Sequence, residues 1–191
     1  GLPNVGKSTL FNSLTKKGVP AENYPFCTID PSVGIVPVPD ERLDLLSKFS
    51  NSAKTIPTVV EFVDIAGLVA GASKGEGLGN RFLAHIRETD AILQIVRIFE
   101  DDKIIHVHGK IDPIHDISVV NLELILADFE TTQKRLQNIS KDIKKGDKKA
   151  IKESETLNKI NKALEAGLFA RIVPLDEEEM ALVKQLNLLT T

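Results

Sequence analysis

The sequence predicts a three-layered α/β domain with a mostly parallel sheet, into which an antiparallel pair of long helices is inserted. Three observations lead to this fold class. A glycine-rich turn precedes the first helix, β-branched segments alternate with helical ones as far as residue 116, and a coiled-coil repeat replaces that alternation over residues 117–166. Strands that alternate with helices are typical of a parallel sheet covered on both faces. The predicted α/β domain therefore comprises residues 1–116 and 167–191, and the helical insertion comprises residues 117–166.

The first eight residues, Gly1-Leu-Pro-Asn-Val-Gly-Lys-Ser8, match the pattern G-x-x-x-x-G-K-[ST] of a phosphate-binding loop (P-loop) without a mismatch. The glycines let consecutive backbone N–H groups point at one anion, and the helix expected to begin near Lys7 presents its positive dipole end to it. The lysine reaches the β- and γ-phosphates, while the Ser8 hydroxyl is a ligand for Mg²⁺. We expect a nucleotide to contact six consecutive residues: Asn4, Val5, Gly6, Lys7, Ser8 and Thr9.

Both ends of the sequence lack elements that this fold normally carries. A P-loop usually follows a buried strand, whereas here it stands first in the chain. An Asn-x-x-Asp or Asn-x-x-Glu element that reads the base is also absent. We therefore expect that the domain is truncated at both ends, and the sequence itself does not choose between ATP and GTP.

Local patterns place the other elements of the α/β domain. Two prolines in 23–31 exclude a regular helix there, so this segment is predicted to be a loop. Asp40 is a suitable N-cap for a helix that ends at Phe49, and Asp176 for one that ends at Leu189. The further predictions are helices over 8–17 and 80–88, and strands over 33–38, 58–64 and 91–99.

The strand over 58–64 ends in a carboxylate, Asp64, which is followed by Ile-Ala-Gly67. Such a strand delivers its aspartate to the carboxyl edge of the sheet, where α/β proteins bind ligands. There the aspartate holds Mg²⁺, usually through water, and the N–H of Gly67 bonds the γ-phosphate. Thr28 is the second predicted hydroxyl ligand; the alternative is a turn threonine that bonds its own backbone. The predicted metal ligands are thus Ser8, Thr28 and Asp64.

Leu68 follows this glycine at the position where Ras-like enzymes carry the glutamine that orients the attacking water. A leucine side chain forms no hydrogen bond with water. Either hydrolysis is slow, therefore, or another group positions the nucleophile. The glycine-rich run over 71–79 is interpreted as a mobile continuation of the second switch loop.

Several segments together resemble the YchF (Obg-like ATPase) family over essentially the whole chain. The segments are Gly1-Leu-Pro-Asn-Val-Gly-Lys-Ser8, Asn23-Tyr-Pro-Phe-Cys-Thr-Ile29, Phe62-Val-Asp-Ile-Ala-Gly-Leu-Val69, Gly71-Ala-Ser-Lys-Gly-Glu-Gly-Leu-Gly-Asn80, Ile86-Arg-Glu-Thr-Asp90 and Ile104-Ile-His-Val107. The resemblance implies a translation-factor-related P-loop protein in which a hydrophobic residue replaces the catalytic glutamine. It further implies a preference for ATP over GTP and association with the ribosome, through the large subunit or its RNA. The C-terminal TGS domain of that family is not found in this sequence.

The resemblance also nominates a substitute for the missing glutamine. In the YchF family the histidine of the Ile-Ile-His-Val motif is the candidate for this role, which here is His106. An imidazole near the γ-phosphate could orient water or supply charge. The alternative is a loop histidine without a chemical role. Asn4 is similar to the asparagine that holds K⁺ in potassium-stimulated relatives, so K⁺ is a second candidate cofactor beside Mg²⁺.

The helical insertion is predicted from apolar residues at alternating three- and four-residue steps. The first helix carries Leu122, Ile125, Phe129, Thr132, Leu136, Ile139 and Ile143, and the second carries Leu157, Ile160 and Leu164. Between them, residues 141–152 contain six lysines against two aspartates. This tip is either a solvated turn or a sequence-independent contact with RNA phosphates.

Composition limits the classes of function. The net charge of −3 argues against attraction of nucleic acid to the whole surface, and nothing indicates DNA binding. No apolar run is long enough to cross a bilayer, no secretory leader stands at the start, and a lone Cys27 fits a reducing compartment, so we predict a cytoplasmic protein. The predicted function is a ribosome-associated, Mg²⁺-dependent ATPase that acts as a switch. The alternatives are an Obg-type GTPase, or a nucleotide-gated ribosome- or RNA-binding module whose hydrolysis is incidental.

Overall fold

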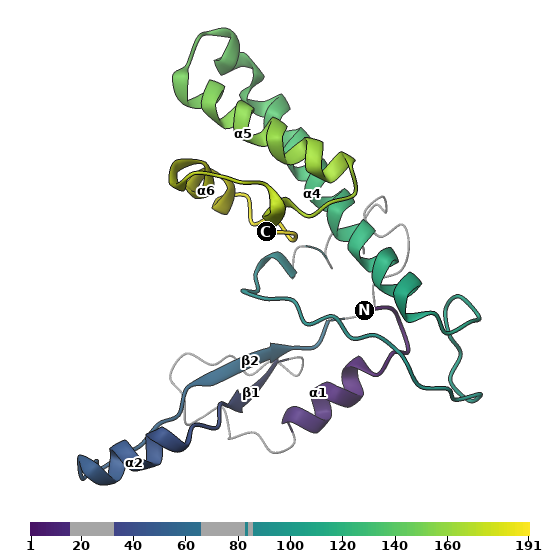
Figure 1. Cartoon of the computed structure of the whole chain (residues 1–191), viewed down its shortest axis with the longest axis vertical. Helices are drawn as coiled ribbons and strands as arrows, with labels where there is room; N and C mark the ends of the chain where they lie inside the picture. The colour runs from purple at the N-terminus through teal and green to yellow at the C-terminus, as the bar shows by residue number, and fades with distance from the viewer. Residues whose placement is uncertain (16–32, 66–82, 84–85) are drawn as a thin grey trace. The chain divides into compact units, whose positions relative to one another are not determined.

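The computed structural model describes residues 1–15, 33–65, 83 and 86–191. Its elements, in chain order, are α1 (Lys7–Thr15), β1 (Val33–Pro37), α2 (Glu41–Phe49), β2 (Val59–Val63), α4 (Pro113–Lys144), α5 (Lys148–Glu165), the 3₁₀-helix η2 (Ala170–Ile172) and α6 (Glu177–Lys184) (Figure 1). The chain divides into two compact units. The smaller unit is Gly6–Ile65, and the larger consists of Gly1–Val5 together with Ala66–Thr191.

In the smaller unit, β1 and β2 form a two-stranded antiparallel sheet in which Val33 pairs with Val63 and Pro37 with Val59. Helix α1 packs against β1 at Gly34, where an added Cβ would lie 2.0 Å from Thr15 Cγ2. Only glycine therefore fits at this contact. The carboxylate of Asp40 accepts the N–H of Arg42 and caps α2, as predicted. In the part of the chain that the structure describes, this sheet is the only one, so the mostly parallel pairing is not seen there.

The predicted strand over 91–99 is wrong, because these residues have no regular secondary structure. The apolar pattern suggested a buried strand, yet Leu93 is 63% exposed and Ile98 is 79% exposed. A strand also needs a neighbouring backbone to pair with its N–H and C=O groups. Here the start of the chain approaches the Ile95 carbonyl so closely that an added Cβ on Gly1 would lie 2.0 Å from its oxygen.

Helices α4 and α5 form an antiparallel hairpin in the larger unit (Figure 1). Helix α4 begins at Pro113, four residues before the predicted start, because Asp112 caps it by accepting the N–H of His115 and proline suits the first turn. The turn between the helices places Gly146 at φ 81°, and Asp147 then caps α5 by accepting the N–H groups of Lys149 and Ala150.

The apolar seam between these helices is largely as the sequence indicates. In α5, Leu157, Ile160 and Leu164 are all buried, whereas Leu122 of α4 is 50% exposed and does not belong to the seam. Leu122 precedes the stretch of α4 that α5 covers. The one polar seam residue, Thr132, is fully buried and donates to Asn161 Oδ1 of α5.

The C-terminal segment packs on the hairpin through η2 and α6. A capping box between Asp176 and Glu179 begins α6, and the helix ends at Lys184 rather than at the predicted Leu189. Asn187 has φ 46°, a left-handed conformation that breaks the helix. Among the described residues, no helix is both long and apolar enough to cross a bilayer.

The carboxylate of Asp128 ties this segment to α4. It is fully buried and accepts the N–H groups of Leu189 and Thr190 and the hydroxyl of Thr190, each at 2.8 Å. Nη1 of Arg87 lies 3.2 Å from the same carboxylate and also donates to the Asn187 carbonyl. Four donors therefore compensate the burial of one charge.

We expect Asp128→Ala to lower the free energy of unfolding by about 3–5 kcal/mol, because the N–H groups of Leu189 and Thr190 lose their acceptor and the partly buried Arg87 loses its ion-pair partner. The measurement is the midpoint of a denaturant titration at constant slope. The control is Asp142→Ala on the same helix, an exposed carboxylate 3.1 Å from Lys145 Nζ, whose removal is expected to cost under about 0.5 kcal/mol. Equal losses for the two variants would contradict this account of Asp128.

Candidate nucleotide site

The P-loop has the backbone that an anion cradle requires. Asn4 and Gly6 adopt left-handed conformations with φ of 60° and 98°, and α1 begins directly after them at Lys7. Leu10 N–H donates to the Gly6 carbonyl at 2.9 Å and closes the first helical turn. At φ 98° a side chain would strain the backbone, so Gly6 is required at this point. The side chain of Val5 is buried, so only its backbone can contact a ligand.

Lys7 and Asp64 lie within electrostatic range of each other. Burial lowers the pKa of Lys7, and the negative charge of Asp64 partly offsets that effect. Asp64 directly follows β2, so this strand brings its carboxylate toward the lysine that begins α1. The predicted phosphate-binding and metal-binding residues of this unit therefore converge.

The oxygen donors present here suit Mg²⁺, which prefers carboxylate, hydroxyl and phosphate oxygens. Asp64 is half-buried, while Ser8 and Thr9 are exposed at the start of α1. Thr28, Gly67 and Leu68 lie outside the described residues, so their predicted roles remain predictions.

Arg97 organises the loop that leads to the predicted catalytic histidine. Arg97 is only 1% exposed, and its guanidinium donates to the carbonyls of Phe99, Asp101 and Ile104 at 3.0, 3.1 and 2.9 Å. It also lies 4.7 Å from the centroid of the Phe99 ring. The sequence interpretation missed this residue. A single charged side chain within the apolar run 91–99 is the signal that could have found it.

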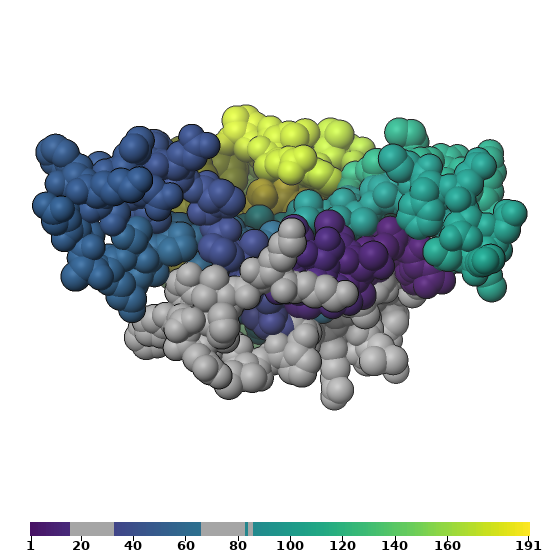
Figure 2. All heavy atoms as spheres, turned by 90° about the horizontal axis from the view of Figure 1, so that it is seen from below, coloured from purple at the N-terminus to yellow at the C-terminus, as the bar shows by residue number. Residues whose placement is uncertain are grey.

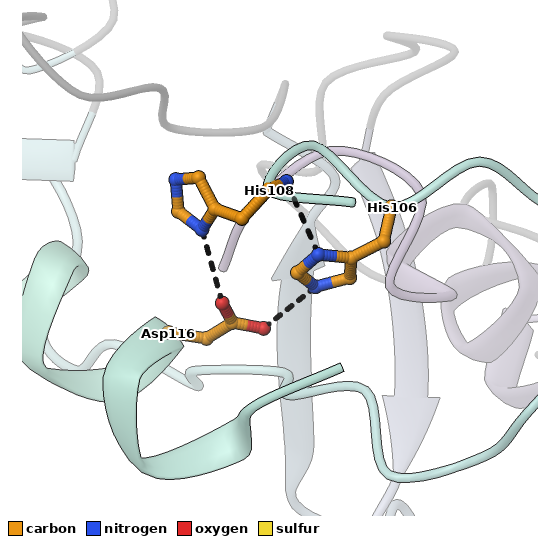
Figure 3. A group of neighbouring side chains, drawn as sticks. All are labelled: His106, His108 and Asp116. Atoms are coloured by element: carbon orange, nitrogen blue, oxygen red, sulfur yellow. Dashed lines mark hydrogen bonds and ion pairs between the residues drawn. The ribbon is translucent and has the colours of Figure 1, made fainter. Parts of the chain in front are cut away.

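His106 is buried beside the first turn of α4 (Figure 3). Its Nε2 lies 2.8 Å from Asp116 Oδ2, and its Nδ1 accepts the backbone N–H of His108 at 3.2 Å. Asp116 Oδ1 in turn lies 3.4 Å from His108 Nδ1. These bonds assign the tautomer: Nδ1 is an acceptor, so the proton is on Nε2 and is donated to the carboxylate.

These three side chains also have the composition of a metal site, and their ligand atoms lie within 4.8 Å of one another. The hydrogen bonds argue against a metal in this arrangement. His106 Nε2 carries the proton that Asp116 accepts, and a metal ligand would need a lone pair on that nitrogen. If the proton were on Nδ1 instead, it would face the N–H of His108, and the hydrogen bond between these two groups would be lost. We therefore interpret the cluster as a hydrogen-bond network.

The loop before His106 also contacts the P-loop. Nδ2 of Asn4 donates to the Ile105 carbonyl at 3.2 Å, which ties the phosphate-binding loop to the residue next to His106. The start of the chain, which carries the P-loop, is purple in the space-filling view (Figure 2). The structure thus brings Asn4 close to the backbone that carries His106.

Comparison with known proteins gives the family of this chain. The family model described as a 50S ribosome-binding GTPase matches residues 1–162. The chain belongs to this family. The match starts at the P-loop and extends into helix α5.

Relatives at higher similarity carry the name YchF, and the resemblance to that family is confirmed. The chain is 60% identical over 191 residues to the ribosome-binding ATPase YchF of Bacillus subtilis (strain 168), and 55% identical over 190 residues to that of Escherichia coli O157:H7. These matches cover all of this chain and 52% of either relative, so the chain spans about half their length.

A solved structure, described as the Schizosaccharomyces pombe YchF GTPase, has the same fold. It is 42% identical, matches 100% of this chain and 52% of its own, and superposes with a TM-score of 0.81. With the family match, this confirms a P-loop NTPase α/β fold. The three-layer order of the sheet and the coiled-coil character of the hairpin remain predictions.

We expect Arg97→Ala to loosen residues 99–109, since the carbonyls of Phe99, Asp101 and Ile104 lose their donor. Hydrogen–deuterium exchange of a peptide covering this loop should accelerate about tenfold or more, at amides such as Ile104 N–H and Gly109 N–H, which donate within the loop. The control is Arg171→Ala, an exposed arginine that also lies 4.7 Å from a phenylalanine ring, that of Phe169. An unchanged exchange rate in the Arg97 variant would contradict the role of Arg97 in ordering this loop.

Proposed function

We propose that this chain is the nucleotide-binding part of a ribosome-associated P-loop NTPase that hydrolyses ATP as a switch. The observation that carries the proposal is the convergence of Lys7, at the start of α1, and Asp64, at the end of β2, beside a glycine with a positive φ angle. This is the constellation that holds a nucleotide triphosphate and its metal ion. Relatives named ribosome-binding ATPase YchF support the choice of partner and nucleotide.

The residue roles follow from the chemistry of each group. Backbone N–H groups at Asn4 to Gly6 and the ammonium of Lys7 hold the β- and γ-phosphates. Ser8, Thr28 and Asp64 would hold Mg²⁺, which supplies positive charge against the charge that develops on the transferred phosphoryl group. The N–H of Gly67 would sense the γ-phosphate, so that nucleotide state changes the loop that follows β2. K⁺ beside Asn4 is a further candidate cofactor.

His106 is the proposed group that positions the attacking water, in place of a glutamine. The support is its place next to Ile105, whose carbonyl binds the P-loop residue Asn4. Since the Leu68 side chain cannot bond water, another group is needed if hydrolysis is to be accelerated, and a histidine suits that task. In the arrangement described, both of its ring nitrogens are already engaged, so the ring must move to act.

The hairpin is the proposed contact with the ribosome, at the large subunit or its RNA. Lys144, Lys148 and Lys149 are exposed around the turn between α4 and α5. Two other lysines of the tip are already in ion pairs, Lys145 with Asp142 and Lys152 with Glu178. Phosphate contacts by exposed lysines add affinity without sequence specificity. A protein that meets ribosomes in this way is expected in the cytoplasm.

Two alternatives remain. The family model and the S. pombe structure are both described as GTPases, which favours an Obg-type GTPase as the second candidate. Tenfold tighter binding of GTP than of ATP by the full-length protein would establish it. The engaged state of His106 favours the other candidate, a nucleotide-gated binding module whose hydrolysis is incidental.

We expect His106→Ala to lower kcat for ATP hydrolysis by the full-length protein about 100-fold, with ribosomes present, because the water loses its positioning group. The measurement is phosphate release at saturating ATP, with and without ribosomes. Lys103→Ala is the control, since this side chain is exposed in the loop that precedes His106. If neither ribosomes nor His106→Ala alter the rate, the binding-module alternative is correct.

Replacing Lys144, Lys148 and Lys149 by glutamine should weaken ribosome binding and flatten its dependence on salt. If each lysine meets one phosphate, the slope of log K against log[salt] should fall by about 2–3. The measurement is sedimentation with ribosomes at several ionic strengths. The matched control replaces three exposed lysines outside the hairpin, Lys48, Lys54 and Lys103. Equal slopes for both variants would exclude a specific role of the tip.

A further inference from the structure

The carboxylate of Asp116 is a fixed point beside a loop that has no regular structure. Asp116 lies in the first turn of α4, is 3% exposed, and donates its own N–H to the Asp112 carbonyl at 2.9 Å. His106 and His108 belong to the irregular segment that precedes the helix. Figure 3 shows both imidazoles directed at the two oxygens of this one carboxylate.

The bond to Asp116 prevents His106 from acting on water. Nδ1 accepts an N–H two residues along the same loop, so this bond moves with the loop. Nε2 instead donates to a residue on a different element, α4. A histidine that orients water needs one nitrogen directed at that water. The bond that has to break is therefore the one between Nε2 and Asp116 Oδ2.

We propose that Asp116 is a positioning residue that holds His106 in a withdrawn state, and that hydrolysis requires release of Nε2 from this carboxylate. The inference rests on the proposed role of His106. It adds how that role is regulated. We call the contact between His106 and Asp116 the latch; the rate of hydrolysis depends on the fraction of molecules in which the latch is open.

Release does not leave a buried charge without a partner. Asp116 Oδ1 lies 3.4 Å from His108 Nδ1, and the side chain of His108 is 30% exposed, so this imidazole can adjust toward the carboxylate when His106 leaves. The ring of His115 lies 5.1 Å from that of His108, centroid to centroid, and adds a further imidazole to the network. An unpaired buried carboxylate would be unfavourable. Because His108 remains beside Asp116, the free-energy cost of opening the latch stays low.

Both sides of the latch connect to predicted ligand sites. On the loop side, the Ile105 carbonyl next to His106 accepts a hydrogen bond from Asn4 of the P-loop. On the helix side, Asp116 lies in the first turn of the continuous helix that ends at Lys144 of the hairpin tip. A nucleotide that reorders Asn4, or a partner that shifts α4, changes the Nε2–Oδ2 distance. Small shifts of packed helices are a known means of transmitting such changes.

The test uses the full-length protein and the variant Asp116→Asn, which keeps the shape of the side chain and removes its charge. We expect kcat for ATP hydrolysis in the absence of ribosomes to rise about tenfold with little change in KM, because more molecules have a free Nε2. The matched control is Asp112→Asn, which also removes one charge at the start of α4 but keeps a good cap, and its kcat should not change.

The effect must also depend on His106. In a His106→Ala background, Asp116→Asn should leave kcat unchanged, whereas a purely structural role would lower it in both backgrounds. If Asp116→Asn instead lowers kcat as much as His106→Ala does, Asp116 orients an active histidine and the withdrawn state is refuted.

A spectroscopic measurement on the unmodified protein covers the case in which the variant fails to fold. With ¹⁵N-labelled histidine, the nucleotide-free protein should show His106 protonated at Nε2, and a non-hydrolysable ATP analogue together with ribosomes should shift that signal. An unshifted signal beside a normal loss of rate in His106→Ala refutes the latch alone. A wild-type rate in His106→Ala refutes the proposed role of His106, and the latch with it.

Discussion

A carboxylate removed from water must receive hydrogen-bond donors, and this constraint determines how the larger unit is built around α4. The carboxylates that this helix buries include Asp116 in its first turn and Asp128 farther along, which are 3% and 0% exposed. Each is compensated by groups from other parts of the chain: imidazoles of the 106–108 loop for Asp116, and N–H groups of the C-terminal segment for Asp128. An unpaired buried charge costs several kcal/mol, so both segments are fixed to the helix. Helix α4 thus serves as the support on which the irregular parts of this unit are ordered.

The 97–109 loop shows the same constraint for neutral groups. Its backbone has no strand to pair with among the described residues, and its carbonyls are satisfied by a buried side chain, that of Arg97. A ladder of backbone bonds has one geometry, whereas side-chain bonds can be exchanged for others of similar energy. A loop held in this second way can present His106 in more than one position. That property fits a residue that acts only in one nucleotide state.

The sequence predicted those elements whose signals are local. Asp40 and Asp176 cap the helices that they were expected to cap, because a cap depends on residues within one turn. The α5 seam was correct since helical spacing alone determines which face is apolar. The strand over 91–99 failed because pairing depends on a neighbour that no local pattern specifies. The same limit applies to the site: His106 was nominated by resemblance, yet its partner Asp116 lies ten residues away on another element and was not foreseen.

Replacing a switch-loop glutamine by a loop histidine has a physical consequence beyond chemistry. The imidazole belongs to a different loop from the switch glutamine, and there its N–H lies within hydrogen-bond distance of the Asp116 carboxylate. With Leu68 in the glutamine position, the positioning group can therefore be stored in a stable withdrawn state beside Asp116. The storage site lies at the start of the helix whose other end carries the exposed lysines of the hairpin. In the proposed mechanism, the contact between α4 and the loop that bears His106 controls hydrolysis, and the bond that has to be broken makes the basal rate slow.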